Sequence, residues 1–158
     1  MKINQGKKFE NNFKASIPSN CWFYRLRDGT ANWTGGFNNN VRFQQNNIAD
    51  CIVFNGNKLY ICELKAHAGK SIPLSCIRQN QAEMMLKANV YHNINCLLFV
   101  FFYEINKCYA LNIDDFDDYV KKNTRKSIPI AYFEEKAIEI PVRMLKTNHR
   151  FALLEFFS

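Results

Sequence analysis

The sequence predicts an α/β fold in which a mixed central β-sheet is flanked by helices. Two kinds of segment lead to this prediction. Residues 48–54 and 59–65 are apolar at both alternating positions, which is typical of strands covered on both faces. Residues 7–17, 75–88 and 113–121 carry the apolar spacing of amphipathic helices. Strands buried on both sides and helices with one apolar face together build a sheet between helical layers.

Length and composition predict one domain over residues 1–158. The chain is 47% hydrophobic and 15% aromatic, enough for a core, and a second domain has no room. A formal charge of +7 and a pI near 9.1 favour a polyanionic partner, although a ribosomal or membrane-surface role fits the same numbers. Residues 1–49 carry seven Lys or Arg against two acidic residues, a net charge of +5. A solvated surface that aids solubility is the alternative explanation.

The cysteines and the apolar runs predict a cytoplasmic protein without a membrane partner. Six cysteines occur singly and behave as small buried hydrophobes. The N-terminal residues are polar and basic, so we expect no signal peptide and a reducing compartment. The longest apolar run, residues 96–103, is far shorter than the roughly 20 residues of a membrane helix.

The first predicted element is a helix from Lys7 to about Ile17. Phe9, Phe13 and Ile17 fall in one narrow stripe, and Glu10 lies on its flank. Pro18 ends the helix because it cannot continue the backbone hydrogen bonding.

A short strand at 21–26 follows, and the composition then changes sharply through residues 28–47. This segment is rich in Gly, Asn and Gln and has no apolar periodicity. A linker is one explanation, but one helix and one strand are too little to form a domain before it. We therefore expect a protruding insertion within the domain.

The central part of the chain contains the two apolar strands, joined by a hairpin turn at Asn55–Lys58, and then a helix. Ser75 is the expected N-cap of that helix, which runs to about Ala88. Gln81 shares its apolar stripe with Ile77, Met84 and Ala88. Such an amide either lies at a partly exposed edge of the stripe or points into an active site.

Two further strands, at 96–102 and 107–111, precede an acidic helix over 113–121. The carboxylates at 114, 115, 117 and 118 stand at the start of this helix, where they favour its dipole. A metal site there is the less favoured alternative.

The strongest chemical signal is Asp50 followed thirteen residues later by Glu63-Leu64-Lys65. Strand side chains alternate between faces, so Glu63 and Lys65 project to the same side. A charge buried in such a strand needs a partner or a metal. Two carboxylates and one lysine are the groups that a metal-dependent phosphodiesterase gathers around a phosphate. A surface ion pair on an edge strand is the alternative.

This order of Asp50, a short turn and Glu-x-Lys resembles the core of the PD-(D/E)xK nuclease superfamily. Flanking strings sharpen the resemblance: Gly6-Lys7-Lys8-Phe9-Glu10, Gly69 to Leu74, Asn80-Gln81 and Arg125-Lys126-Ser127-Ile128. In this order they resemble RecU-type Holliday junction resolvases, including the compact versions carried by phages of low-GC Gram-positive bacteria. The resemblance extends from about Gly6 to Pro141. The chain departs from the family at Ile48-Ala49, where many members have threonines.

The resemblance implies a restriction-endonuclease-like core from which residues 28–47 protrude as a stalk. It implies an endodeoxyribonuclease that resolves four-way DNA junctions by paired cuts, as a homodimer in a bacterial or phage-infected cell, with an unidentified recombinase as a further partner. Its cofactor would be Mg²⁺, with Mn²⁺ as a substitute. The remaining alternatives are another nuclease of this superfamily that cuts duplexes or flaps, and a DNA-junction binding protein without catalysis.

Each candidate residue has an expected role. Magnesium prefers oxygen ligands, which Asp50, Glu63 and the carbonyl of Leu64 can supply. Lys65 would orient the attacking water or neutralise charge on the phosphate. The resemblance adds Glu10 as a further ligand and Gln81 as a catalytic residue. The expected DNA-binding residues are Lys7, Lys8, Arg25, Arg27, Arg42, Lys70, Arg125 and Lys126.

Overall fold

A computed structural model describes residues 4–26, 29–30, 44–45 and 47–158. Most of the predicted insertion at 28–47, with Arg27 and Arg42, lies outside these residues. Its two described ends form the short strands β2 (Gly29–Thr30) and β3 (Gln44–Gln45). They pair antiparallel, with Gly29 opposite Gln45, so the two ends of the insertion are held side by side.

Six strands of the described chain form the central sheet, in the order β1-β4-β5-β7-β8-β10. Their bounds are β1 Trp22–Arg25, β4 Cys51–Phe54, β5 Leu59–His67, β7 Ile94–Phe102, β8 Lys107–Asn112 and β10 Ile138–Ile140. β5 and β7 run parallel, and the other neighbouring pairs run antiparallel. The predicted α/β class with a mixed sheet is therefore confirmed.

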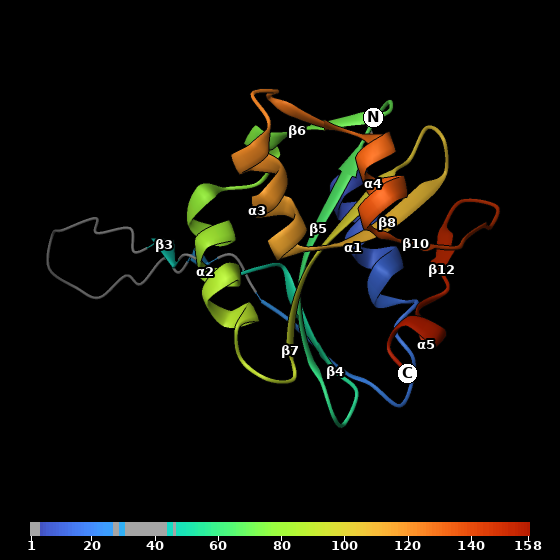
Figure 1. Cartoon of the computed structure of the whole chain (residues 1–158). Coiled ribbons are helices and arrows are strands. Elements are labelled where there is room, and N and C mark those ends of the chain that lie inside the picture. Colours follow the sequence, from blue (N-terminus) through green and yellow to red (C-terminus); the bar gives the residue numbers. More distant parts are fainter. Residues whose placement is uncertain (1–3, 27–28, 31–43, 46) are drawn as a thin grey trace, which may run out of the picture.

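Both faces of the sheet are covered, as the apolar pattern of the strands predicts. Figure 1 shows α2 (Gln79–Asn89) and α3 (Ile113–Lys122) on one side of β5 and β7, and α1 (Gln5–Lys14) with α5 (Leu153–Phe156) on the other. Along β7, Leu98 and Val100 enter the core beneath α2 and α3, whereas Phe99 and Phe101 enter the opposite core. α4 (Ile130–Lys136) adds Phe133 to the first core.

Besides β2 and β3, two more short ladders of the described residues lie outside the central sheet. β6 (Ser71–Pro73) pairs antiparallel with β9 (Ser127–Pro129), which joins the loop after β5 to the segment after α3. β11 (Val142–Met144) and β12 (His149–Phe151) form a hairpin. Phe151 fixes this hairpin because its ring packs on Phe9 of α1 with 5.1 Å between the ring centroids.

The first helix and the strand expected over 48–54 begin or end where the predictions did not place them. α1 begins at Gln5, because the side chain of Asn4 caps it by accepting the Lys7 N–H at 3.0 Å, and ends at Lys14. Residues 48–50 form a bend, so the strand expected over 48–54 begins at Cys51.

The helix expected to begin after Ser75 is also displaced. Residues 74–76 form a short 3₁₀ turn, and α2 begins at Gln79 with Arg78 in the N-cap position. Ser75 is therefore not the N-cap. The cause is the non-local β6–β9 pairing, in which the Leu74 N–H donates to the carbonyl of Lys126 at 2.9 Å. Helical periodicity carries no signal for such a contact.

None of the helices in the described ranges combines the length and the apolar character needed to cross a membrane.

Candidate active site

The bend before β4 places Asp50 close to Glu63. Cys51 pairs with Cys62 across β4 and β5, and the Asp50 N–H, just before β4, donates to the carbonyl of the same Cys62 at 3.2 Å. Asp50 Oδ2 accepts the Leu64 N–H at 2.7 Å, which fixes its carboxylate beside the peptide that follows Glu63. The two carboxylates therefore lie close enough for the charge of Asp50 to act on Glu63.

Glu63 is only 1% exposed, and both of its carboxylate oxygens have a donor. Lys65 Nζ donates to Oε1 at 2.5 Å, and Gln81 Nε2 donates to Oε2 at 3.3 Å. Gln81 is itself buried and reaches Glu63 from α2. The expected proximity of Glu63 and Lys65 is present, and Gln81 points toward this pair rather than lying at an exposed edge.

The electrostatics of the pair follow from burial. Burial and then the charge of Asp50 raise the pKa of Glu63, and Lys65 and Arg78 partly oppose them, so that this pKa lies at about 7. Burial lowers the pKa of Lys65, but the charges of Glu63 and Asp50 outweigh it, so that its pKa lies above the ordinary value. Lys65 therefore keeps its proton at neutral pH. Additional positive charge nearby would stabilise the ionised form of Glu63.

The donor set suits a hard divalent cation. Asp50, Glu63 and the Leu64 carbonyl offer oxygen ligands close together, and magnesium is usually held by one or two carboxylates together with substrate phosphate and water. Within the described ranges, no three His, Cys, Asp or Glu side chains are grouped so as to hold a metal ion. A cation held by Asp50 and Glu63 would therefore need further ligands from substrate phosphate and water.

Glu10 lies near Asp50 but is held by another residue. It forms an ion pair with Arg25 of β1. Both side chains line a hollow of about 20 Å³ with Asp50 and Leu64. Because a cavity of roughly 10–15 Å³ can hold a water, this hollow has room for about one. Glu10 is not grouped with Asp50 and Glu63 as a third ligand, so its ligand role stays a prediction.

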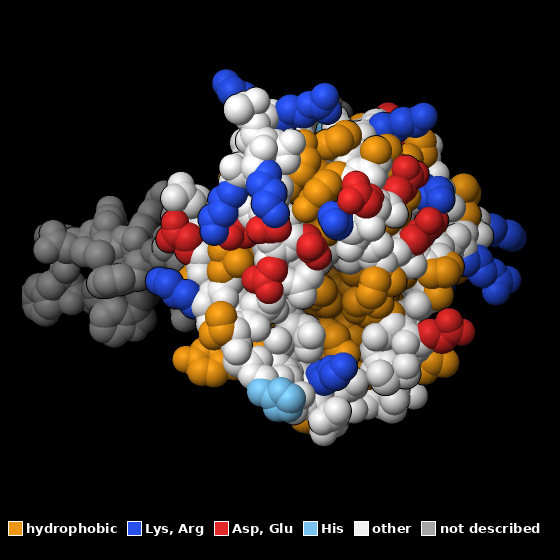
Figure 2. Space-filling model, in the orientation of Figure 1, with side chains coloured by type: hydrophobic (Ala, Val, Ile, Leu, Met, Phe, Trp, Pro, Cys, Tyr) orange, Lys and Arg blue, Asp and Glu red, His pale blue; other side chains and the backbone are white. Residues whose placement is uncertain are grey.

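The expected DNA-binding residues within the described ranges lie in three places, and most are exposed. Lys7 and Lys8 stand on α1, and Arg25 stands on β1. The other three lie around the β6–β9 ladder: the carbonyl of Lys70 accepts the Ile130 N–H at 2.8 Å, and Arg125 and Lys126 immediately precede β9. Figure 2 shows Lys and Arg side chains along the edge of the molecule where β6 lies.

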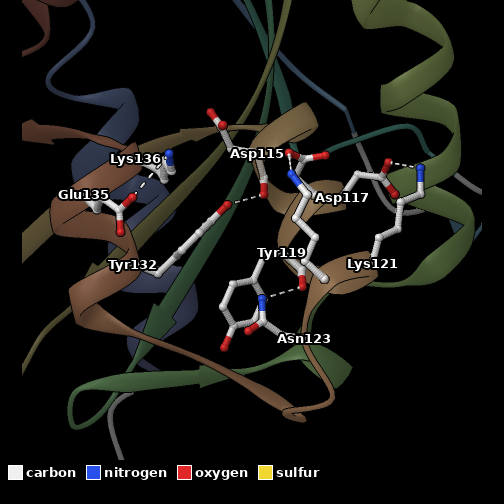
Figure 3. A network of polar contacts seen from close by, with 10 residues as sticks. Asp115, Asp117, Tyr119, Lys121, Asn123, Tyr132, Glu135 and Lys136 are labelled. Atoms are coloured by element: carbon white, nitrogen blue, oxygen red, sulfur yellow. Dashed lines mark hydrogen bonds and ion pairs between the residues drawn. The ribbon is translucent and has the colours of Figure 1, made fainter.

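The acidic residues at the start of α3 take part in contacts within the fold. Asn112 caps the helix by accepting the Asp114 N–H at 2.9 Å, and Asp117 and Asp118 pair with Lys121 and Lys122 at 2.5 and 2.6 Å. Figure 3 shows Tyr132 of α4 reaching α3, where its hydroxyl donates to the Asp115 carbonyl at 2.7 Å. The carboxylates of Asp117 and Asp118 thus serve ion pairing, whereas Asp114 and Asp115 contribute backbone groups to the helix cap and to the attachment of α4.

A larger hollow of about 590 Å³ lies at the β10 edge of the sheet. Tyr60, Ile138 and Phe156 contribute to its lining, and Figure 2 shows hydrophobic side chains at its floor. None of the predicted site residues in the described ranges lines it. This hollow is not the candidate active site despite its size, because Glu63, Lys65 and Asp50 all lie elsewhere.

One contributor to the site escaped the sequence analysis. Arg78, in the N-cap position of α2, lowers the pKa of Glu63 through its charge. In the sequence, only the position of Arg78 three residues before Gln81 indicates that it lies near Glu63. This indication depends on the observed start of α2 at Gln79.

Comparisons with known proteins show the family of the chain and a similar fold. Residues 31–155 match the family model of recombination protein U (RecU). The SPbeta prophage-derived uncharacterized protein YotM of Bacillus subtilis (strain 168) is 32% identical over 166 residues, covering 95% of this chain and 83% of that protein. The structure of Hjc, a Holliday junction resolvase of Archaeoglobus fulgidus, has a TM-score of 0.53 at 12% identity, over 85% of this chain and 95% of that chain. The likeness to the Hjc structure concerns the fold alone.

Proposed function

This chain belongs to the recombination protein U family, and on that premise we propose that it is a metal-dependent endodeoxyribonuclease that resolves four-way (Holliday) DNA junctions. The prophage-derived relative agrees with the expected resemblance to a compact phage-type member. The archaeal protein with the similar fold is itself named a Holliday junction resolvase. The family and the fold therefore support the same class of enzyme.

The observation that carries the proposal is the buried Glu63, which contacts Lys65 directly and lies near the charge of Asp50. Burying Glu63 beside the charge of Asp50 is costly unless the site receives positive charge. A protein that only binds DNA gains nothing from negative charge near phosphates. The cluster therefore favours hydrolysis over binding alone.

In the proposed mechanism, Asp50, Glu63 and the Leu64 carbonyl would hold Mg²⁺, with Mn²⁺ as a substitute. When bound, such a cation polarises the scissile phosphodiester and lowers the pKa of the attacking water. Lys65, protonated at neutral pH, would donate to that water or to a phosphate oxygen as negative charge develops. Gln81 keeps one oxygen of Glu63 in a fixed position.

The rest of the proposal concerns substrate and assembly. Paired cuts across a symmetric four-way junction require two active sites, so we propose a homodimer of one-domain subunits that acts on DNA in the bacterial or phage-infected cytoplasm. Glu10 would contact metal-bound water. The expected basic residues, including Arg27 and Arg42, would contact phosphates.

The test is a cleavage assay on a denaturing gel. Purified protein is incubated with a mobile four-way junction, a linear duplex and a flap, each with magnesium or with EDTA. We expect paired, symmetrically placed nicks in the junction, only with magnesium, and little cutting of the other two substrates. Preferential cutting of duplex or flap would assign a different nuclease activity. Binding of the junction without any cleavage would contradict catalysis.

A further inference from the structure

The β11–β12 hairpin carries a like-charge pair that its own fold does not require. Arg143 stands directly opposite Arg150 in the antiparallel register. Both are exposed, and like charges placed opposite one another destabilise a strand pair. None of the ion pairs found among the described residues includes Arg143, Arg150 or Lys146, which lies in the connecting turn.

The hairpin is nevertheless firmly attached to the molecule. The Phe151 ring packs against Phe9 and against Phe101, with 5.3 Å between the centroids of the second pair. The Phe151 N–H donates to Ser16 Oγ at 3.0 Å. Because neighbouring strand positions alternate, Arg150 then points away from this contact toward solvent. The fold thus holds two arginines outward on a rigid support.

A polar hollow of about 460 Å³ continues from the turn of the hairpin to α1. It is lined by Asn4, Lys7, Lys8, Asn11, Asn12, Thr147 and Asn148, and this lining contains no carboxylate. Asn12 is only 5% exposed, and among the residues described its Nδ2 has no hydrogen-bond partner. An unsatisfied buried donor is costly, and a bound acceptor would satisfy it.

The first turn of α1 adds to the positive character of this hollow. It contains no acidic residue, and the N-terminal end of a helix favours anions. Burial and then the charge of Lys8 lower the pKa of the neighbouring His149 in β12, so the positive charge of this surface comes from its lysines and arginines.

We propose that the β11–β12 hairpin and the first turn of α1 form a phosphate-binding surface for a duplex arm of the DNA substrate. The inference rests on the proposed function and extends it, because Arg143, Lys146, Arg150, Asn12 and the 147–148 turn become DNA contacts. The surface offers charges and amides but no exposed aromatic ring for base stacking. Its contacts therefore follow the backbone and do not read sequence. α1 connects this surface to the candidate active site, because Asn11 lines both this hollow and the smaller one beside Asp50.

The test compares three variants for binding to a labelled four-way junction at several salt concentrations in EDTA. Arg143→Gln/Arg150→Gln removes the charges, and Arg143→Glu replaces the like-charge pair by a cross-strand ion pair. Lys121→Gln/Lys122→Gln is the matched control, because it removes two exposed lysines that already pair with Asp117 and Asp118. Thermal melting of each protein reports whether it folds.

We expect the double Gln variant to lower the slope of log affinity against log salt by about two, since each phosphate contact contributes roughly 0.9. Arg143→Glu should bind DNA more weakly than wild type although its melting temperature is equal or higher, which a structural role of Arg143 would not produce. The control should keep the wild-type slope. An unchanged slope in the double Gln variant, or the same loss in the control, would overturn the proposal.

Two further readouts separate this inference from the proposed function. If wild-type protein cuts no junction but the slope falls as expected, the surface stands and the nuclease assignment fails. If junctions are cut normally and the slope is unchanged, the surface fails alone. Binding to phosphatidylserine vesicles is measured in parallel, and a loss confined to the vesicles would assign the hairpin to membranes and overturn the DNA contact.

Discussion

The ammonium of Lys65 lies 2.5 Å from Oε1 of Glu63, two residues away on the same face of β5. The Glu63 side chain is buried, whereas that of Lys65 is about one quarter exposed, so the pair connects the core to the surface. The ionisation of the buried Glu63 carboxylate should therefore change with pH, with cation binding and with removal of Lys65.

The stability of the metal-free protein should fall as pH rises from about 4.5 to about 7. The ordinary pKa of a glutamate is 4.5, and that of folded Glu63 is about 7. Between these values the folded protein holds a proton that the unfolded chain has lost, so the free energy of unfolding decreases by on the order of 3 kcal/mol. Urea unfolding in EDTA across this range measures the effect, and Glu63→Gln should flatten it.

Magnesium should stabilise the protein more at alkaline than at acidic pH. A metal ligand must be deprotonated, and the raised pKa of Glu63 makes that less favourable below about 7. We expect the rise in melting temperature on adding magnesium to be larger at about pH 8 than at about pH 6. The same rise at both pH values would argue against Glu63 as a ligand.

Lys65→Ala should lose most of the cleavage rate, about a hundredfold or more, because a charge opposing the developing negative charge is removed. Lys65→Arg should rescue poorly, since a planar fork does not reproduce a compact ammonium. Single-turnover cleavage of a four-way junction measures both. Lys107→Ala is a matched control, because Lys107 forms an exposed ion pair with Glu139 at 2.7 Å. Full activity of Lys65→Ala would show that the pair is structural.

Gln81 is expected to act as a positioning residue. Gln81→Ala removes the donor to Glu63 Oε2, so the pKa of Glu63 should rise and the acidic limb of the pH–rate profile should move to higher pH. The rate should fall by about tenfold, as for other groups that orient a metal ligand. Gln79→Ala is the control on the same helix, since Gln79 is exposed and bonds only to Glu83 among its described contacts. A slower enzyme with an unshifted pH profile would contradict the role.

Much of this site could be predicted from the sequence because it depends on local geometry. The shared face of Glu63 and Lys65 follows from strand alternation, and the proximity of Asp50 to the stretch that contains Glu63 follows from a hairpin with a short turn. The α/β class and the resemblance to RecU-type proteins were confirmed for the same reason: they depend on patterns that continue along the chain.

The remainder depends on contacts between distant residues. The true start of α2, and hence the direction of Gln81, depends on the pairing of β6 with β9. The ion pair of Glu10 with Arg25 depends on how α1 packs beside β1, which no periodicity reports. The catalytic and DNA-binding roles of the predicted residues stay predictions until they are tested in solution.

The most direct test of the central claim is the single-turnover cleavage rate of a mobile four-way junction by wild-type protein and by Glu63→Gln, with magnesium. The substitution keeps the shape of the side chain and removes its charge. The proposed site predicts paired cuts by wild type, a loss of cleavage in the variant, and junction binding that is equal or tighter because a negative charge near the phosphates is gone. Cleavage by Glu63→Gln at the wild-type rate would contradict the account.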